Sequence, residues 1–217
     1  NLLIRARIVQ KSQSGLNAKY FLAESEYLPA SYYANMSADH LYHRAFIELA
    51  LIRIAENPVE TREADFWKEI MSLRDLFKFE FFYANKEKFT EEVKEELTLF
   101  DPNWKEILND ADGDIYQVLR NQSLFVSEAV LHTYLEANQV VLQALTNWDK
   151  EKDYTEKEFL KTCIFAGKEM HWLGLIRRSE NTSKPFLVNG LRLMKNRKLL
   201  PNQAESTGER IQEMIDE

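Results

Sequence analysis

Residues 73–89 read LRDLFKFEFFYANKEKF, and this stretch concentrates the chain's aromatic side chains. Its first part has leucines and a phenylalanine at helical spacing, opposite charged residues. Within residues 77–83 only Lys78 and Glu80 interrupt the aromatic run. A helix that is apolar on every side must be covered on every side, so the pattern predicts a central packing helix. A strand is the alternative because FKFEF alternates, but no hairpin turn flanks the segment.

The composition indicates a helical globular protein. At 217 residues the chain is one large domain or two small ones, and it is long enough to bury a substantial core. The small numbers of glycines (6) and prolines (5) argue against an all-β fold. A single cysteine, Cys163, excludes a disulfide framework and is typical of a reducing compartment. Its apolar neighbours predict a small buried side chain. The longest apolar run, residues 45–55, contains Glu48 and Arg53, so no membrane-spanning segment is predicted.

Hydrophobic periodicity and helix punctuation predict an all-α fold. A capping box at Thr155 and Glu158 begins one helix, and Asp101-Pro102 ends another. We expect a multi-helix orthogonal bundle in which the aromatic stretch and the long apolar helix at residues 124–148 are two largely buried central helices. The helices are expected at residues 31–55, 61–83, 86–99, 104–108, 124–148, 155–173, 183–198 and 209–216.

The chain divides into three expected parts. Residues 1–30 form a linker or the continuation of an upstream domain, since they mix apolar residues with arginines and contain loop signals at Ser12–Gly15. Residues 31–200 form the helical domain, and residues 201–217 form a polar tail. The first residue is not Met, and we expect the chain to be a piece of a longer protein.

Charge is unevenly distributed along this acidic chain. Residues 87–114 contain ten acidic side chains and three lysines, whereas residues 171–200 contain seven Lys or Arg residues and one Glu. Solvated helix faces explain both stretches in the simplest way. The sharper hypothesis is that the basic stretch contacts an anion, such as a phosphate, acidic lipid headgroups or an acidic protein surface.

Candidate catalytic and metal-binding patterns are incomplete. Asp110, Asp112 and Asp114 resemble the start of a calcium loop, but Gly and Glu are missing from the positions that an EF-hand requires. His43 and Glu48 have the spacing of a His-x4-acid dyad, but five helical residues turn the two side chains well apart. The sequence therefore predicts no catalytic residue, no metal ligand and no cofactor in this chain.

Two further histidine patterns point to structure. His40 and His43 are three residues apart on an expected helix, but a third metal ligand at matched spacing is missing. His132 and His171 lie among apolar residues, where a histidine with internal partners is the more common finding.

Several segments, taken together, resemble the C-terminal region of membrane-bound glycerol-3-phosphate acyltransferases. These are the aromatic stretch itself, SYYANMSADHLYHRAFIELAL at residues 31–51, VSEAVLHTYLEANQVVLQAL at residues 126–145, and GLIRRSENTSKPFLVNGLRLMKNRKLL at residues 174–200. They follow the family's order and cover roughly residues 31–200. Departures include Asp39 where the family's His is expected, with His40 one place later, and Gly190 where Ala is usual.

The resemblance implies a parent enzyme that transfers an acyl group from acyl-CoA or acyl-carrier protein to the sn-1 hydroxyl of glycerol 3-phosphate, in the first step of phospholipid synthesis. It implies a peripheral location at the cytoplasmic face of a membrane. The family's His-x4-Asp motif lies in an upstream acyltransferase domain and is absent from this chain. The implied partners are that domain, both substrates and an anionic membrane surface.

The positions carried over as candidate substrate-binding residues are Arg177, Arg178, Lys184, Glu180, Ser183, Asn189, Tyr33, Asn35 and His40. The alternatives are structural: Ser183 as a helix N-cap and Glu180 as the partner of Arg177 or Arg178. Asn189 is the strongest candidate, because an amide inside an apolar helix needs partners.

A rival hypothesis is a free-standing helical interaction module with a basic anion-binding end. The overall acidic balance of the chain argues against nucleic acid as its ligand.

Overall fold

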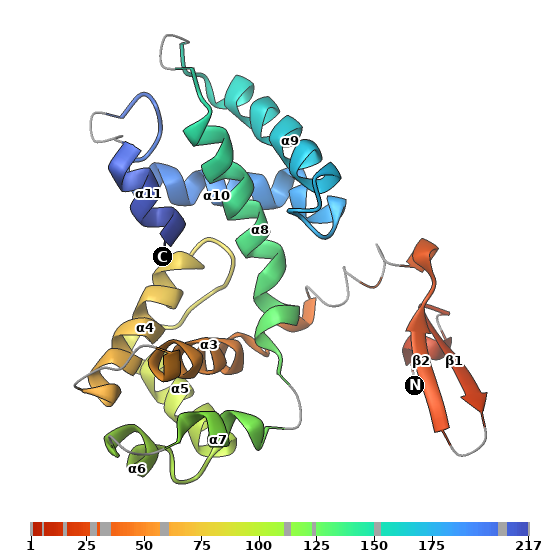
Figure 1. The fold of residues 1–217 in the computed structure, drawn as a ribbon, viewed down its shortest axis with the longest axis vertical. Coiled ribbons are helices and arrows are strands. Elements are labelled where there is room, and N and C mark those ends of the chain that lie inside the picture. The colour runs from red at the N-terminus through yellow and green to blue at the C-terminus, as the bar shows by residue number, and fades with distance from the viewer. Residues whose placement is uncertain are drawn as a thin grey trace.

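The computed structural model describes residues 2–5, 7–14, 17–26, 30, 36–56, 61–110, 114–122, 125–149, 153–203 and 208–216. Over these residues the molecule is a helical bundle preceded by a small hairpin (Figure 1). The helices of the bundle are α3 (Tyr42–Glu56), α4 (Arg62–Leu76), α5 (Lys86–Phe100), α6 (Trp104–Asn109), α7 (Ile115–Arg120), α8 (Ser127–Thr146), α9 (Glu156–Trp172), α10 (Lys184–Asn196) and α11 (Gly208–Asp216), with a 3-10 turn η2 (Ser179–Thr182) before α10. The predicted helical class is confirmed.

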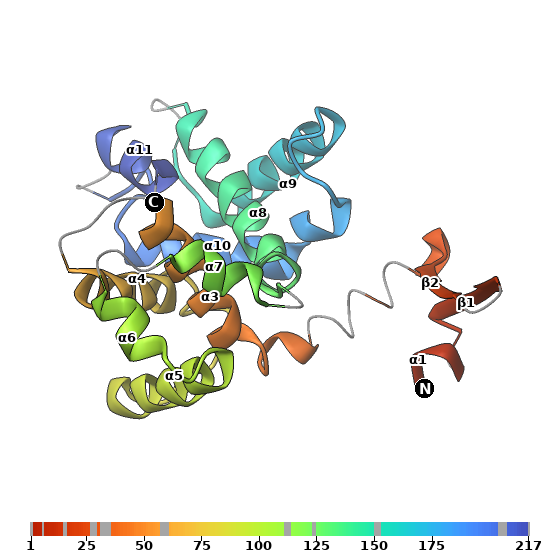
Figure 2. The same cartoon turned by 60° about the horizontal axis from the view of Figure 1, so that its bottom comes forward.

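The N-terminal part differs from the prediction. A short helix α1 (Leu2–Arg5) precedes two antiparallel strands, β1 (Val9–Ser14) and β2 (Asn17–Leu22), and a 3-10 turn η1 (Glu24–Glu26) follows them. The loop expected at Ser12–Gly15 is wrong for the part that lies in β1. Almost every residue of β2 is exposed, so no apolar alternation marks the strand in the sequence. Figures 1 and 2 both show the hairpin standing apart from the helices.

Helix α8 is the central element of the bundle. Its N-terminal half, through Tyr134, belongs to a hydrophobic cluster that it shares with α3, α4, α5, α6 and α7. From Val140 onward it belongs to a second cluster, shared with α9, α10 and α11. Twelve of its residues are buried, in agreement with the prediction of a largely buried helix at residues 124–148. Figure 1 shows α8 running through both groups of helices.

The aromatic stretch is only partly helical. Helix α4 ends at Leu76, and residues 77–80 form a turn instead of the predicted helix through residue 83. Leaving the helix lets Phe77 and Phe81 enter the core, while Phe82 is 95% exposed. A continued helix would have to cover every face of this aromatic run, whereas the turn needs a cover only for those rings that point inward. Four of the five aromatic rings are buried or half-buried, so the central position is confirmed and the helix beyond Leu76 is wrong.

The buried rings of this turn, Phe77 and Phe81, contact two helices, α3 and α8. Phe77 lies 5.6 Å from Phe46 of α3 between ring centroids, and Phe81 lies 5.1 Å from Tyr42 of α3 and 5.2 Å from Tyr134 of α8. Ring pairs at these separations add stabilisation beyond the area that they bury. Residues 77–83, here called the aromatic turn, are therefore the aromatic centre of the first cluster.

Local capping agrees with the helix starts seen in the structure. The Thr155 hydroxyl accepts from the Glu158 backbone N–H at 3.3 Å, as the capping box predicts for the start of α9. Asn85 caps α5 in the same way, at 2.9 Å from the Lys88 nitrogen. Helix α7 was not predicted, because it has only six residues and lies beside a polar run.

A short helix near the C-terminus joins the second hydrophobic cluster. The short helix expected at residues 209–216 is present as α11, and Met214 is buried in the second cluster. None of the helices in the described part of the chain has the length and apolar content that crossing a bilayer requires.

Candidate functional site

The basic segment that connects α9 to α10, residues 177–184, is anchored to α8 by a buried carboxylate. Glu136 of α8 is only 4% exposed, and its Oε1 accepts from the backbone N–H of Arg177 at 2.8 Å. Its Oε2 accepts a short hydrogen bond from the side-chain amide of Asn181 in η2. His132, one turn earlier on α8, places Nε2 2.9 Å from Oε1. Glu136 therefore fixes the course of residues 177–181 over α8.

The candidate cations of this segment point outward. Arg177, Arg178 and Lys184 are all exposed, while Ile176 and Asn181 are buried beneath them. The Arg177 guanidinium forms an ion pair with Glu128 of α8, where both side chains are exposed. An exposed pair of this kind contributes little to stability, so Arg177 is available to exchange its partner for an anion.

The structure bears on two structural alternatives, Ser183 as the N-cap of α10 and Glu180 as the partner of an arginine. Ser183 occupies the N-cap position of α10, but in the described part of the chain its side chain accepts no capping hydrogen bond. Its backbone N–H donates to the carbonyl oxygen of Glu180 at 3.0 Å. Arg177 pairs with Glu128 and not with Glu180. Within the described residues no ion pair joins Glu180 to Arg177 or to Arg178, so the expected pairing of Glu180 is wrong.

Asn189 has the partner that its position in α10 demands. Its side-chain amide donates to Oε2 of Glu80 at 2.9 Å, and this bond joins α10 to the aromatic turn. Burial raises the pKa of Glu80 to about 7, although the hydrogen bond from Asn189 opposes the shift. Lys78 donates to Asp75 at 2.8 Å and also to Asn196 near the end of α10. Because Asn189 and Asn196 both lie in α10, the two polar residues of the aromatic run, Lys78 and Glu80, both contact this helix.

The remaining candidates lie at the start of the bundle. Tyr33 and Asn35 lie outside the described residues. His40 is exposed in a turn, and its backbone N–H donates to Ser37 at 3.1 Å. The charge of the adjacent Asp39 contributes, after burial and Glu92, to raising the pKa of Tyr42 to about 12. The charge of Asp39, in the same turn as His40, therefore acts on a ring of the aromatic cluster. The structure does not bring His40 together with Asn189, whose side-chain amide binds Glu80.

The His-x4-acid pair is not a dyad. His43 Nε2 lies 3.4 Å from Glu92 of α5, whereas the Glu48 carboxylate accepts from the backbone N–H groups of Val126 and Ser127 at 2.8–3.1 Å. The prediction that the two side chains point apart is confirmed. Glu48 is fully buried and neutralises the N-terminus of α8.

The other titratable candidates also have structural roles. Asp114 caps α7 by accepting from the Gln117 backbone N–H at 3.1 Å, and it pairs with Arg120 at 2.9 Å. Asp112 lies outside the described residues. His171 places Nδ1 3.0 Å from the carbonyl oxygen of Ile176. Cys163 is buried as predicted, and burial raises the pKa of its thiol to about 12. Within the described residues, no three His, Cys, Asp or Glu side chains are grouped as metal ligands.

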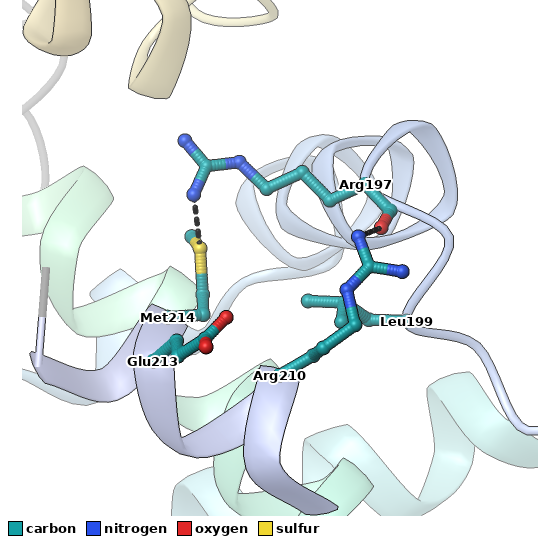
Figure 3. Close-up of a pocket in the computed structure, with 5 residues that line it drawn as sticks. All are labelled: Arg197, Leu199, Arg210, Glu213 and Met214. Carbon is teal, nitrogen blue, oxygen red and sulfur yellow. Dashed lines mark hydrogen bonds between the residues drawn. The ribbon is translucent and has the colours of Figure 1, made fainter. Parts of the chain in front are cut away.

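A pocket of about 380 Å³ lies between the end of α10 and α11, lined by Arg197, Leu199, Arg210, Glu213 and Met214 (Figure 3). Arg197 donates to the Met214 sulfur at 2.6 Å and lies 3.3 Å from Asp75. Arg210 donates to the Arg197 carbonyl oxygen at 3.0 Å. Both guanidinium groups in Figure 3 are directed at protein acceptors, so the pocket lies where α11 meets the residues that follow α10. None of the predicted site residues lines it.

Residues 1–203 match the glycerol-3-phosphate acyltransferase C-terminal region. The chain belongs to this family. The resemblance seen in the four sequence segments is confirmed by that match.

Curated relatives of this acyltransferase C-terminal region carry a matching name. Proteins named "Putative acyltransferase plsB1" from Mycobacterium bovis and from Mycobacterium tuberculosis strains CDC 1551 and H37Rv are each 27% identical to it over 218 residues. The alignments cover 99% of this chain and 35% of each relative, so the chain spans about a third of their length. No solved structure matches the chain at a significant level.

In this acyltransferase C-terminal region, two family segments are in direct contact in space. The aromatic turn and α10 meet at the bond between Glu80 and Asn189. Sequence reasoning missed Glu136, Asn181 and the capping role of Glu48. A signal existed for the two glutamates, since each interrupts a strongly apolar helix, where a buried carboxylate needs partners.

Proposed function

We propose that the chain is the C-terminal helical region of a glycerol-3-phosphate 1-O-acyltransferase that acts in phospholipid synthesis. The match of residues 1–203 to the family carries this proposal, and the acyltransferase name of the relatives supports it. The acyl donor would be acyl-CoA or acyl-carrier protein. The glycerol 3-phosphate hydroxyl forms the new ester bond to the acyl carbon, the thioester C–S bond breaks, and the hydroxyl proton ends on the released thiol.

In this proposal the chemistry belongs to an acyltransferase domain elsewhere in the longer protein. This chain contains no His-x4-Asp sequence. In the most similar pair, His43 contacts Glu92 and Glu48 accepts from the start of α8, so the two side chains do not meet. The chain alone is then inactive. Its role is to pack against the catalytic domain at the cytoplasmic face of a membrane and to present the basic segment 177–184 to an anion.

The reaction is tested with the longer protein and the 217-residue chain side by side. Formation of acylglycerol phosphate from labelled glycerol 3-phosphate is measured with a long-chain acyl-CoA and with the matching acyl-carrier protein. We expect product from the longer protein with at least one donor and none from the chain alone. Acylation of other alcohols without acylation of glycerol 3-phosphate would contradict the proposed substrate, and activity of the isolated chain would contradict the division of labour.

The basic segment is tested by charge reversal in the longer protein. Arg177→Glu, Arg178→Glu and Lys184→Glu are combined, because these three exposed cations lie on one segment. We expect the KM for glycerol 3-phosphate to rise, or the affinity for anionic vesicles to fall, by about tenfold.

The matched control reverses three exposed lysines of the acidic part of the chain: Lys86, Lys88 and Lys105. It should leave both quantities within about twofold, since these lysines lie among acidic residues. Unchanged kinetics and vesicle binding in the triple variant would show that the segment meets no anion.

A further inference from the structure

The C-terminal end of α9 carries an exposed apolar tip. Trp172 is 84% exposed, Leu173 is 68% exposed and Leu175 is 58% exposed, and Phe165 on the same helix is 70% exposed. Figures 1 and 2 show this end of α9 at the edge of the helical bundle. Single exposed apolar side chains are normal on a protein surface, whereas several large ones exposed together mark an interaction surface.

The backbone holds this tip in a defined shape. The Gly174 N–H donates to the His171 carbonyl oxygen at 3.0 Å, and the Leu175 N–H donates to the Met170 carbonyl oxygen at 2.9 Å. With Gly174 at a φ of 74°, these two bonds form the Schellman motif that ends many helices. Such a motif usually tucks its last apolar residue against the helix, but here Leu175 is exposed and Ile176 is the buried residue.

The tip also has cations beside it. Lys168 lies one helical turn before Trp172, and Arg178 follows the tip on the segment that Glu136 holds in place. Both side chains are exposed. Glu169 is the acidic residue nearest in sequence to Lys168, and residues 165–184 together contain four Lys or Arg residues and two Glu residues. The apolar tip therefore lies in a locally basic part of an acidic protein.

We propose that this tip, Trp172, Leu173 and Leu175 with Lys168 and Arg178, is where the chain contacts an anionic lipid surface. Trp and Leu side chains favour the boundary between headgroups and acyl chains, and flanking Lys and Arg side chains add attraction to acidic headgroups. A helix end that exposes these side chains at the rim of the molecule can insert them without any change of fold. The proposal rests on the membrane location proposed above and names the surface that provides it.

The proposal is tested by sedimentation of the 217-residue chain with vesicles, without substrate. One set of vesicles contains phosphatidylglycerol mixed with phosphatidylcholine, and the other contains phosphatidylcholine alone. The chain should bind the first set, and added salt should weaken the binding. Replacing all three apolar residues by Ser, or combining Lys168→Glu with Arg178→Glu, should each reduce the partition coefficient about tenfold.

Two exposed apolar side chains elsewhere provide matched controls. Leu99→Ser on the acidic helix α5 and Phe82→Ser in the aromatic turn remove side chains that are 77% and 95% exposed, respectively. Each control should bind anionic vesicles like the unaltered chain. Circular dichroism shows whether each variant retains its helices, so loss of binding by a folded variant is informative.

Fluorescence locates the contact. The other three tryptophans are buried or half-buried, so Trp172 should dominate any blue shift and any quenching by brominated acyl chains. Trp172→Phe should abolish both signals while largely preserving binding. Failure of the unaltered chain to bind anionic vesicles would overturn the proposal, as would equal loss in the Leu99 control; either outcome leaves the acyl-transfer measurement on the longer protein unaffected. Loss of acyl transfer by tip variants that still bind vesicles would assign the tip to a protein contact instead.

Discussion

At the scale of single residues, Glu80 connects the aromatic turn to α10 through a half-buried carboxylate. Burial raises the pKa of this group from 4.5 to about 7. A carboxyl group with a raised pKa binds its proton more tightly in the folded state than in the unfolded state. The stability of the protein should therefore fall as the pH rises from about 4.5 to about 7, and this contribution should be constant above that range.

Glu80→Gln tests this coupling. The amide retains an oxygen that can accept from Asn189 and carries no charge to bury. We expect the variant to be more stable than the unaltered protein at pH 8, by up to about 3 kcal/mol, with the difference vanishing near pH 4.5. Urea unfolding across this pH range measures the effect. A constant difference at all pH values would show that ionisation of Glu80 is not responsible.

Gly167 is the second informative residue, because a side chain there meets η2. A Cβ atom at position 167 would lie 2.8 Å from both Cβ and Cγ2 of Thr182. The Thr182 hydroxyl donates to the Ser179 carbonyl oxygen at 2.7 Å, which holds this side chain in place. Close packing of α9 against the basic segment thus depends on a glycine.

Gly167→Ala should destabilise the protein by about 1–2 kcal/mol, because overpacking outweighs the gain of about 1 kcal/mol in helix propensity. Thermal unfolding measures the loss. The exposed neighbour Lys168→Ala is the control and should change stability by less than about 0.5 kcal/mol. Increased stability of the alanine variant would contradict this prediction and would mean that η2 shifts to admit the methyl group with little loss of free energy.

At the scale of elements, a side chain of α3 caps the N-terminus of α8. The first free amides of α8 have no side-chain cap from their own segment, and Glu48 of α3 accepts from Val126 and Ser127 instead. Such a contact satisfies orphan amides and places a negative charge at the positive end of a helix. The orientation of α8 relative to α3 is therefore determined by a carboxylate from another element.

Glu48→Ala should lower stability by about 2–4 kcal/mol, because two buried amides lose their acceptor. Hydrogen exchange at the start of α8 should accelerate more than exchange in α9. Glu56→Ala, at the exposed end of the same helix α3, is the matched control and should cost less than about 0.5 kcal/mol. An equal loss in both variants would place the effect in helix propensity and not in capping.

At the scale of the whole molecule, α8 belongs to both hydrophobic clusters. Leu131 lies in the first cluster and Leu145 in the second, and each is at most 5% exposed. A helix shared by two cores should make their unfolding cooperative, since neither core retains its full set of contacts when the other opens.

Leu131→Ala and Leu145→Ala test this cooperativity. Each should cost about 2–5 kcal/mol and should shift one common unfolding transition. Calorimetry together with fluorescence of the buried tryptophans follows the transition. Two separate transitions, each moved by only one of the variants, would show that the clusters unfold independently.

The sequence alone predicted the helical class, most helix positions and the burial of Cys163. Periodicity and caps such as Thr155 act over three or four residues, so they are visible in a single segment. The segments that resemble the acyltransferase family were also readable locally, and the family match confirmed them.

Only the tertiary structure decided where the aromatic run leaves its helix and which partners the polar residues have. The bond between Glu80 and Asn189 joins residues 109 positions apart, and Glu48 and Glu136 likewise contact distant segments. The hairpin carries no apolar alternation that would mark its strands. Contacts between distant segments depend on how whole helices pack, and the burial that gives Glu80 its raised pKa exists only after that packing is complete.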